Sequence, residues 1–505
     1  MNISEHLPIL AVVVPLLAAP ICIMLPKGTL SWAWATIVSW VTFAICLALF
    51  DQVYAAEALQ YDLGGWSAPF GIVYRIDILG ALILCLVSGI AAFVFPYARE
   101  SIRKELGDEQ SNGFYTMLLV CMAGLMGVVA TGDAFNVFVF LEVSSLSTYA
   151  LVAMGARQDR RALTAAFTYL VLGTIGATFF VIGLGLLYQA TGTLNMLDLH
   201  DRLAGQDNRV VRAGFAFIVT GLGLKLAMFP LHRWLPDAYT YSPSAVTAFL
   251  ASTATKVAVF AMLRFLFTVF GFTFAFMDVA LFLFILLGLA GMFVASLIAV
   301  FRDDVKQMLA FSSVAQVGYM LLGISFATVD GVSAAVMHVF NHALMKAALF
   351  MAVGAVFYAT RSHQISAYRG LGKRMPFTAA CFIIAGCSLI GFPFTAGFIS
   401  KAMLLNAAFS ATLPVPSLLI AILILMSSLL AVAYIGRVAW AMFLLDPPPN
   451  CAPVPRIPYL MLVPMAAMVL ANLYVGVDAE GLATITRRGA ETLMSSGLLG
   501  TGGAR

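Results

Sequence analysis

Ionisable side chains stand inside stretches of this sequence that are otherwise apolar enough for a lipid bilayer. The stretch 213–241 places Lys225 deep within an apolar run and reaches Pro230 shortly afterwards. A lysine in hydrocarbon costs roughly 2.5–3.5 kcal/mol even on lenient insertion scales, and a helix broken at that depth needs protein or water for its freed backbone groups. A charge beside a break indicates a polar pathway, so an ion-conducting site is the first hypothesis.

A carboxylate suited to Lys225 stands in the middle of the apolar run NVFVFLEVSSLSTYALVAMG, as Glu142. A lone carboxylate in hydrocarbon is normally protonated because desolvation disfavours its charged form, and a nearby lysine reverses that preference. We expect Glu142 to pair with Lys225, so that a proton arriving at Glu142 weakens its hold on the lysine. A static ion pair joining two helices is the alternative. Asp133, in TGDAFN, is predicted to be a helix cap or an entrance carboxylate.

Lys256 follows three hydroxyl residues in the run AFLASTATKVAVFAML. Snorkelling of the side chain to an interface is the simplest explanation for a membrane lysine. Lys256 has roughly half of its helix on either side, which argues against snorkelling. The neighbouring hydroxyl groups suit a hydrated groove, where a lysine can act as a proton carrier.

Three further candidates recur at helical spacing in the run HVFNHALMKAALF. His338, His342 and Lys346 stand at i, i+4 and i+8 and share one helix face. Two histidines at this spacing could serve a zinc site, but the motif lacks the glutamate of H-E-x-x-H and no third ligand is obvious. A proton relay fits better because histidine accepts and donates protons near neutral pH. Hydrogen-bonded structural histidines are the alternative.

Lys401 follows a second set of helix-breaking residues, in GCSLIGFPFTAGFISKAMLL. We expect it near the outer exit of the pathway, with interfacial snorkelling as the alternative. Two other charged groups have simpler interpretations. Asp237 lies close to Arg233 in the sequence, so a local salt bridge is as well supported as a functional role. Lys306 is expected to be an ordinary cation at the cytoplasmic end of its helix.

The composition explains why these groups must lie in a membrane. The 505 residues are 62% hydrophobic and only 10% charged, whereas soluble domains are about 45–50% apolar. The net charge of +4 comes without any long basic run, so nucleic acid is not an expected partner. The seven cysteines form no C-x-x-C pair, and they are interpreted as small hydrophobic residues. No metal or cofactor ligand set is recognisable.

The expected fold is an all-α polytopic membrane protein with about 14 transmembrane helices. Apolar runs of about 20 residues are the length needed to cross a bilayer. The N-terminal run lacks a preceding basic region, so it is predicted to be a retained helix. The predicted segments lie near 7–25, 31–49, 77–98, 114–131, 135–154, 163–188, 212–241 (broken), 244–270, 275–300, 305–324, 332–358, 376–409 (broken), 417–444 and 458–476.

Basic residues predict the orientation of these helices. Lys and Arg are concentrated in the loops that follow odd-numbered helices, and basic loops are retained on the cytoplasmic side. Both termini are therefore predicted on the outer side. Arg487, Arg488 and Arg505 in the C-terminal tail run against this trend.

The chain also repeats itself weakly. Tyr149 and Tyr319 occupy similar contexts, as do Phe229–Pro230 and Phe392–Pro393. The matches predict two five-helix units, helices 4–8 and 9–13, inverted with respect to each other and broken at helices 7 and 12. Such inverted repeats point to a transport site at the repeat interface. The predicted divisions are 1–113, 114–270, 271–445 and 446–505.

Taken together, six stretches resemble the antiporter-like subunits of Mrp-type cation/proton antiporters, complex I and membrane-bound hydrogenases. The likeness covers nearly the whole chain and is strongest to the D-type protein of the Mrp antiporters. The stretches are GGWSAPFGIVYRID (64–77), TGDAFNVFVFLEV (131–143), KLAMFPLHRWLPDAY (225–239), FSSVAQVGYM (311–320), HVFNHALMKAALF (338–350) and GFPFTAGFISK (391–401).

The resemblance implies a central polar axis that conducts protons. It places the functional groups of the family on residues already singled out: Glu142, Lys225, Lys256, His338, His342, Lys346 and Lys401. A lysine at position 401 resembles the Mrp D type and differs from the complex I protein that carries glutamate there. EVSSLSTYAL, which begins at Glu142, differs from the usual Mrp D sequence.

The expected function is that of a proton-translocating subunit of a multisubunit Na⁺/H⁺ antiporter in a bacterial cytoplasmic membrane. Other subunits, the bilayer, protons and a monovalent cation are the expected partners, and no catalytic chemistry of its own is expected. Two alternatives stay open. The chain could pump protons in a redox-driven complex I-like or hydrogenase-like assembly, or it could be a non-conducting scaffold that keeps the polar axis as packing.

Overall fold

The computed structural model describes residues 3–26, 28–272, 274–412, 414–447 and 453–495. Within these ranges, twelve helices are long and apolar enough to cross a membrane. They are α1 (Leu7–Met24), α2 (Thr29–Ala56), α3 (Ile78–Glu105), α4 (Ser111–Ala130), α5 (Ala134–Ala153), α6 (Arg161–Thr191), α10 (Ser244–Leu263), α11 (Met277–Val300), α12 (Val305–Ser325), α13 (Val329–Thr360), α17 (Ser417–Phe443) and α18 (Tyr459–Val477).

Two further segments are pairs of half-helices separated by irregular backbone. α8 (Arg209–Lys225) is followed by α9 (Trp234–Tyr241), and α15 (Pro376–Ile390) is followed by α16 (Ala396–Ser410). With the twelve continuous helices they make the fourteen segments predicted, and both expected breaks are present. The polytopic all-α fold is therefore confirmed.

Short elements complete the fold. α7 (Met196–Leu203) and α14 (Leu371–Arg374) follow the ends of α6 and α13, and α19 (Glu480–Ser495) forms the last described element. β1 (Ala58–Asp62) pairs antiparallel with β2 (Val73–Asp77), and Ala58 lies opposite Asp77. Neither this hairpin nor α19 was predicted, because both lie in segments outside the apolar runs.

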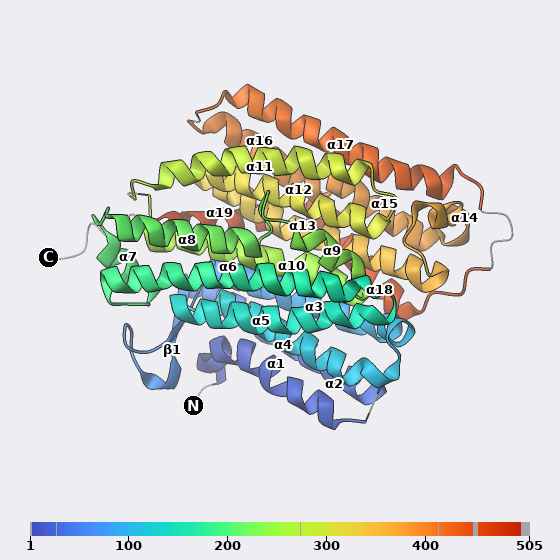
Figure 1. Ribbon diagram of the computed structural model, residues 1–505, viewed down its shortest axis with the longest axis horizontal. Helices are drawn as coiled ribbons and strands as arrows, with labels where there is room; N and C mark the ends of the chain where they lie inside the picture. Colours follow the sequence, from blue (N-terminus) through green and yellow to red (C-terminus); the bar gives the residue numbers. More distant parts are fainter. Residues whose placement is uncertain (1–2, 27, 273, 413, 448–452, 496–505) are drawn as a thin grey trace.

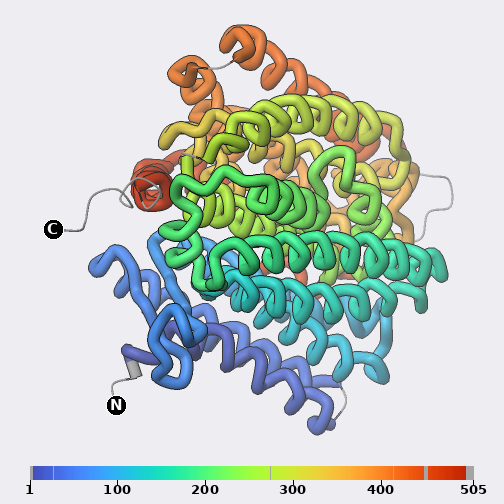
Figure 2. Tube along the Cα trace, turned by 60° about the vertical axis from the view of Figure 1, so that its left-hand side comes forward, coloured from blue at the N-terminus to red at the C-terminus, as the bar shows by residue number. Residues whose placement is uncertain are grey.

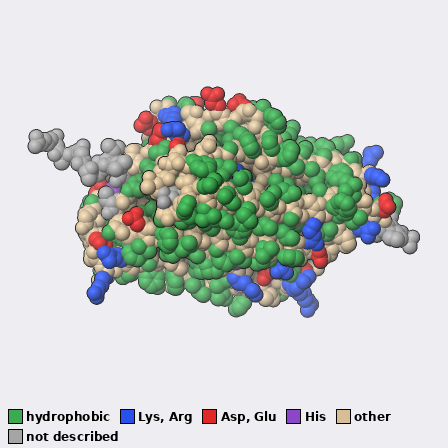
Figure 3. Space-filling view, turned by 90° about the horizontal axis from the view of Figure 1, so that it is seen from above, with side chains coloured by type: hydrophobic (Ala, Val, Ile, Leu, Met, Phe, Trp, Pro, Cys, Tyr) green, Lys and Arg blue, Asp and Glu red, His purple; other side chains and the backbone are tan. Residues whose placement is uncertain are grey.

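The helices form one bundle whose long axis lies horizontally in Figure 1. α1 and α2 lie on one side of the bundle, and α16 and α17 lie on the opposite side, in both Figure 1 and Figure 2. Hydrophobic side chains cover most of the face seen in Figure 3, and most charged side chains lie toward its edges. This distribution is the one expected for a surface in contact with lipid tails between two aqueous layers.

The centre of the bundle contains α10, α12 and α13, which are buried along almost their whole lengths. Helices pack closely in membranes where small residues let the backbones approach. A Cβ atom added to Gly318 of α12 would lie 2.5 Å from the carbonyl oxygen of Gly288 in α11. The glycines therefore permit a backbone contact that holds α12 in the middle of the bundle.

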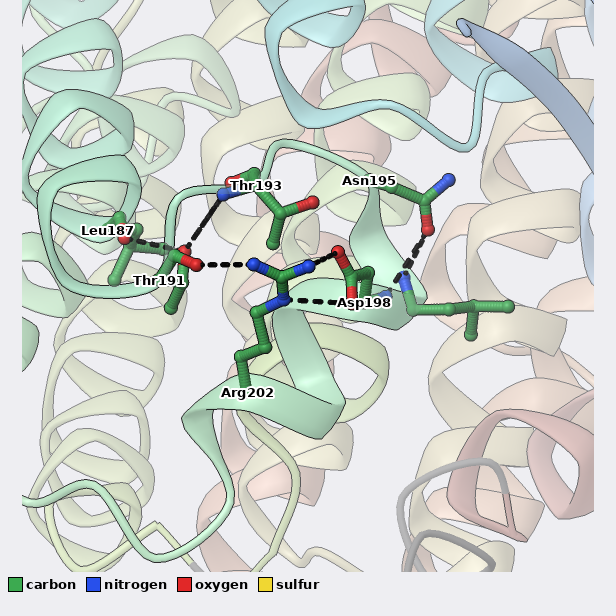
Figure 4. A network of polar contacts seen from close by, with 7 residues as sticks. Leu187, Thr191, Thr193, Asn195, Asp198 and Arg202 are labelled. Atoms are coloured by element: carbon green, nitrogen blue, oxygen red, sulfur yellow. Dashed lines mark hydrogen bonds and ion pairs between the residues drawn. The ribbon is translucent and has the colours of Figure 1, made fainter. Parts of the chain in front are cut away.

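The two five-helix units repeat each other in the turns that follow α6 and α13, which are called the first and the second connector. The hydroxyl of Thr191 donates to the carbonyl of Leu187 at the end of α6 and accepts from the amide of Thr193, and Figure 4 shows this turn with Arg202 packed against it. In the second unit Thr360 makes the same pair of contacts, with the carbonyl of Val356 and the amide of Ser362.

Each connector then pairs with the loop that precedes an earlier helix of its own unit. Asp133 forms an antiparallel bridge with Asn195, and Asp304 forms one with Gln364. Asp133 caps α5 through the amide of Asn136, and Asp304 caps α12 through the amide of Gln307. Asp133 is thus the helix cap that was one of its two predicted roles.

The connectors lie at opposite ends of the bundle. α7 directly follows the first connector and α14 lies just beyond the second, and Figure 1 places these two helices at opposite ends of the long axis. The units therefore run in opposite directions, as the odd number of helices in each requires. The start of α1 and α19 lie toward the α7 end.

Candidate functional site

The break between α8 and α9 is closed by hydrogen bonds within the protein. α8 ends at Lys225, and the indole Nε1 of Trp234 donates to the carbonyl of Leu224 at 2.8 Å. The amide of Met228 donates to the carbonyl of Gly223. Freed backbone groups must be satisfied in this way at membrane depth. The break therefore holds the end of α8 in a defined position.

Lys225 and Glu142 form the ion pair that was predicted. The Lys225 Nζ atom lies 3.1 Å from Glu142 Oε1 and 2.7 Å from the hydroxyl oxygen of Ser145. Ser145 lies one turn beyond Glu142 on α5, so both acceptors come from one helix face. The Lys225 side chain is 7% exposed and the Glu142 side chain 23%, so the carboxylate is the more accessible member.

Lys256 is completely buried in the middle of α10. Its Nζ atom donates to the carbonyl of Ala251 at 2.5 Å and to the hydroxyl of Thr255 at 3.3 Å. The amine thus folds back along its own helix, which excludes snorkelling as the explanation. Among the described residues no hydrogen bond joins Lys256 to the Glu142–Lys225 pair.

Lys346 is held by α12. Its Nζ atom donates to the carbonyl of Leu309 at 2.7 Å and to the hydroxyl of Ser312 at 2.5 Å. Its charge also interacts with Lys256 and with His342. The structure therefore brings Lys256 of α10 close enough to His342 and Lys346 of α13 for their charges to interact.

The two histidines are arranged differently from each other. His338 lies 2.9 Å from the Ser400 hydroxyl through Nδ1 and 2.9 Å from Gln316 Oε1 through Nε2. His342 stacks in parallel with His338, with ring centroids 5.9 Å apart. Neither ring nitrogen of His342 makes a hydrogen bond within the described part of the chain. His338 is therefore oriented by protein groups, and His342 is oriented by packing.

Lys401 reaches back across the second break. Its Nζ atom donates to the carbonyls of Leu389 and Ile390, at 3.1 and 2.8 Å, and to the hydroxyl of Ser428 at 2.9 Å. These carbonyls end α15, where the helix dipole attracts a cation. The side chain is buried, so interfacial snorkelling does not describe it. Whereas Lys225 precedes its break, Lys401 follows the corresponding one.

α12 supports three of these seven groups, and none of its side chains was predicted to do so from the sequence. It supplies Ser312 to Lys346 and Gln316 to His338, and the Lys401 ammonium lies 4.9 Å from the Tyr319 ring centroid. A signal for this role is present, because FSSVAQVGYM carries polar residues at helical spacing in an apolar segment.

Two simpler interpretations are wrong. Lys306 is buried at the start of α12, and its amine donates to the carbonyl of Ser242, so it is not an ordinary surface cation. It is held where the α9–α10 junction packs over the start of α12. Arg233 and Asp237 form no ion pair with each other among the described residues, although they lie one turn apart.

The chain matches a known sequence family and known proteins. Residues 131–430 match the family described as "NADH:quinone oxidoreductase/Mrp antiporter, TM". The chain is 38% identical to the N subunit of the NADH-quinone oxidoreductase of Desulforudis audaxviator, covering 94% of this chain and 97% of that one. It is 29% identical to the D subunit of the Na⁺/H⁺ antiporter of Bacillus subtilis, covering 96% and 97%.

A solved structure shows the same fold along the whole chain. The membrane-bound sulfane sulfur reductase, an archaeal respiratory membrane complex, contains a protein with 29% sequence identity and a TM-score of 0.90. The superposition covers 98% of this chain and 99% of that one. The similarity therefore includes the helices at both ends of the bundle as well as the matched segment.

Proposed function

The chain belongs to the NADH:quinone oxidoreductase/Mrp antiporter transmembrane family, and we propose that it is a proton-translocating subunit of a multisubunit Na⁺/H⁺ antiporter. A bacterial cytoplasmic membrane is the proposed location. Both termini would lie on its outer side, because the basic loops gather at the opposite end. Other subunits of the complex and a monovalent cation are its proposed partners.

One observation carries this proposal. The bundle centre holds Lys256, His338, His342 and Lys346, all buried, with the Glu142–Lys225 pair at one break and Lys401 at the other. Buried ionisable groups in membranes are costly and mark proton or ion pathways. Here five of these seven residues make hydrogen bonds to groups of other helices, an arrangement that would let a proton or charge move in steps.

The geometry supports an electrostatic mechanism. A proton that reaches Glu142, the more exposed member of its pair, would neutralise the carboxylate and weaken its hold on Lys225. The freed lysine charge would then alter the proton affinity of Lys256, because strongly interacting sites titrate together. Lys256 would in turn affect His342 and Lys346, and His338 would pass the change to Ser400, the neighbour of Lys401 in the chain.

A second candidate function rests on a specific observation. The relative at 38% identity is part of an NADH-quinone oxidoreductase, so the same axis would serve in a redox-driven assembly. Any redox step would then belong to partner subunits. A scaffold without conduction is the third possibility, and in that case the polar contacts would contribute to stability alone.

Cation-dependent proton movement in membrane vesicles tests the proposal. Vesicles with the complete complex would carry Glu142→Gln, Lys225→Ala or, as a matched control, the exposed Lys373→Ala. We expect both axis variants to lose most of the transport and the control to retain it. Wild-type transport in both axis variants, with normal assembly, would show that the axis does not conduct. Proton movement that needs a quinone-reducing reaction instead of a cation would favour the second candidate.

A further inference from the structure

A cavity of about 270 Å³ opens at the end of the bundle that carries α14. It lies between the end of α3, the start of α12, the α9–α10 junction and the connector that follows α13. Asp159 and Arg161 stand at its rim, where they form an exposed ion pair. Glu105 and Lys306 are the most deeply buried charged groups in its lining, at 6% and 2% exposure.

The junction between α9 and α10 links these two charged groups. The Lys306 amine donates to the carbonyl of Ser242, and the amide of Ser244 donates to Glu105 Oε2 at 2.9 Å. Glu105 also accepts a hydrogen bond of 2.6 Å from Ser101. The opposite charges interact across this short backbone segment without a direct ion pair. Glu105 and Lys306 are thus buried charges beside a polar cavity, unlike the exposed ion pair at its rim.

Lys306 is also close to the central axis. Lys346 donates to the carbonyl of Leu309, which is one turn beyond Lys306 on α12. Three residues of an α-helix rise by about 4.5 Å. The wall of the cavity and the support of Lys346 therefore belong to successive turns of the same helix.

The inverted repeat places a second cavity at the corresponding position of the other unit. It has a volume of about 60 Å³ and lies beside Asn195, the counterpart of Gln364 in the cavity at the α14 end. The ion pair of Asp77 with Arg264 is part of its wall. Of the two repeat-related cavities, the one at the α14 end is thus the larger, and it holds a lysine in its lining.

From this arrangement we propose that Glu105 and Lys306 form the inner end of a water-filled access path from the α14 end of the bundle to Lys346. The proposal rests on the proposed proton translocation and adds a route to it. Water in the cavity would exchange protons with Lys306, and the charge of Lys306 would act on Lys346 along α12. The access path would thus reach the axis between its two breaks, in addition to the step at Glu142.

The first experiment closes the cavity chemically. Gln364 lies at the rim and is exposed, so Gln364→Cys can be labelled with a bulky, membrane-impermeant maleimide in a complex whose native cysteines are replaced. Lys373→Cys, exposed at the same end but outside the cavity lining, is the matched control. We expect labelling at position 364 to reduce proton transport at least tenfold and labelling at 373 to leave it unchanged.

The second experiment removes the inner charge. Lys306→Gln is expected to reduce transport at least tenfold in assembled complex, whereas Lys373→Gln is expected to transport at the wild-type rate. If Lys306→Gln does not assemble, the labelling experiment decides, since it leaves Lys306 in place. Full transport after complete labelling at position 364 would overturn the access path.

These outcomes are separable from a failure of the proposed function. If Glu142→Gln and Lys225→Ala abolish transport while the labelled Gln364→Cys complex transports normally, translocation stands and the access path is wrong. If the Glu142 and Lys225 variants also transport normally, the proposed function itself fails.

Discussion

The Nζ atom of Lys401 lies 2.8 Å from the carbonyl oxygen of Ile390, so a lysine in α16 caps the end of α15 across the break between them. The cap joins the two half-helices through a single charge. Loss of that charge would weaken the hydrogen bonds to the carbonyls of Leu389 and Ile390 at the same time.

Replacement of Lys401 is expected to affect both transport and stability. Lys401→Ala leaves two buried carbonyl groups without their donor, and each unsatisfied group costs about 1–3 kcal/mol. We expect at least a tenfold loss of proton transport in vesicles and a lower melting temperature of the purified complex. Ser410→Ala, which removes an exposed hydroxyl near the end of the same helix, should change neither value. A Lys401→Ala complex that transports normally would contradict the role given to this residue.

Ser145 is expected to be needed for the ion pair of the first unit. Ser145→Ala removes the 2.7 Å acceptor of Lys225, and hydrogen bonds to charged groups contribute about 1.5–3 kcal/mol. Transport should fall several-fold, and less than in Glu142→Gln, because the carboxylate stays. Ser147→Ala is the control, since that hydroxyl donates to backbone carbonyls of its own helix and does not contact Lys225 among the described residues. Equal rates in the two serine variants would show that Ser145 is a packing residue.

Close packing of α11 and α12 predicts a large difference between two glycine substitutions. Gly318→Ala would bring a methyl group to 2.5 Å from a backbone carbonyl, and such overpacking costs about 1–3 kcal/mol. In contrast, Gly436→Ala meets no atom within 4 Å and improves helix propensity by about 1 kcal/mol. Thermal unfolding of the purified complex should show a lower midpoint for the first variant and an unchanged or higher one for the second. The reverse order would contradict the observed packing.

The two capping aspartates predict a pH-dependent stability. Burial raises the pKa of both Asp133 and Asp304 above the usual range. Their contribution to stability is therefore fully present below the ordinary pKa of about 4 and is lost as pH rises through the folded-state value. Asparagine also caps helices but carries no charge to bury. Asp133→Asn and Asp304→Asn should each raise the melting temperature at pH 8, by an amount that shrinks toward pH 5.

The alanine variants at the same positions provide the contrast. Asp133→Ala and Asp304→Ala remove the acceptor as well as the charge, so the amides of Asn136 and Gln307 lose their caps. They should melt below the asparagine variants at every pH. If the difference in melting temperature between the wild-type complex and each asparagine variant were the same at pH 5 and pH 8, the raised pKa of that aspartate would be contradicted.

Sequence alone predicted the fold because the membrane imposes simple rules. Length and apolarity identify the segments, and Pro230 and Pro393 mark the two breaks. The pairing of Glu142 with Lys225 was predictable because a carboxylate in an apolar segment stays ionised only when a cation lies nearby. The hairpin β1–β2 and the amphipathic α19 were missed since their signals are local and lie outside the apolar runs.

The supporting contacts were harder to predict. Nothing in the spacing of α13 shows that Lys346 would take its acceptors from Leu309 and Ser312. Such contacts depend on the rotation of α12 about its axis, which neighbouring helices determine. Lys306 was misjudged for the same reason. Its position at the start of a helix suggested an exposed cation, and only the packing of the α9–α10 junction over it makes it buried.

The imbalance of charge along the axis has a consequence for how the protein stores protons. Lys256 and Lys346 interact with each other, and neither forms an ion pair with a carboxylate within the described residues. Like charges repel more strongly inside a protein than in water, where the dielectric constant is higher. The two amines therefore resist being charged together. Their combined occupancy, rather than the state of either lysine, is then the quantity that a neighbouring protein of the complex would sense.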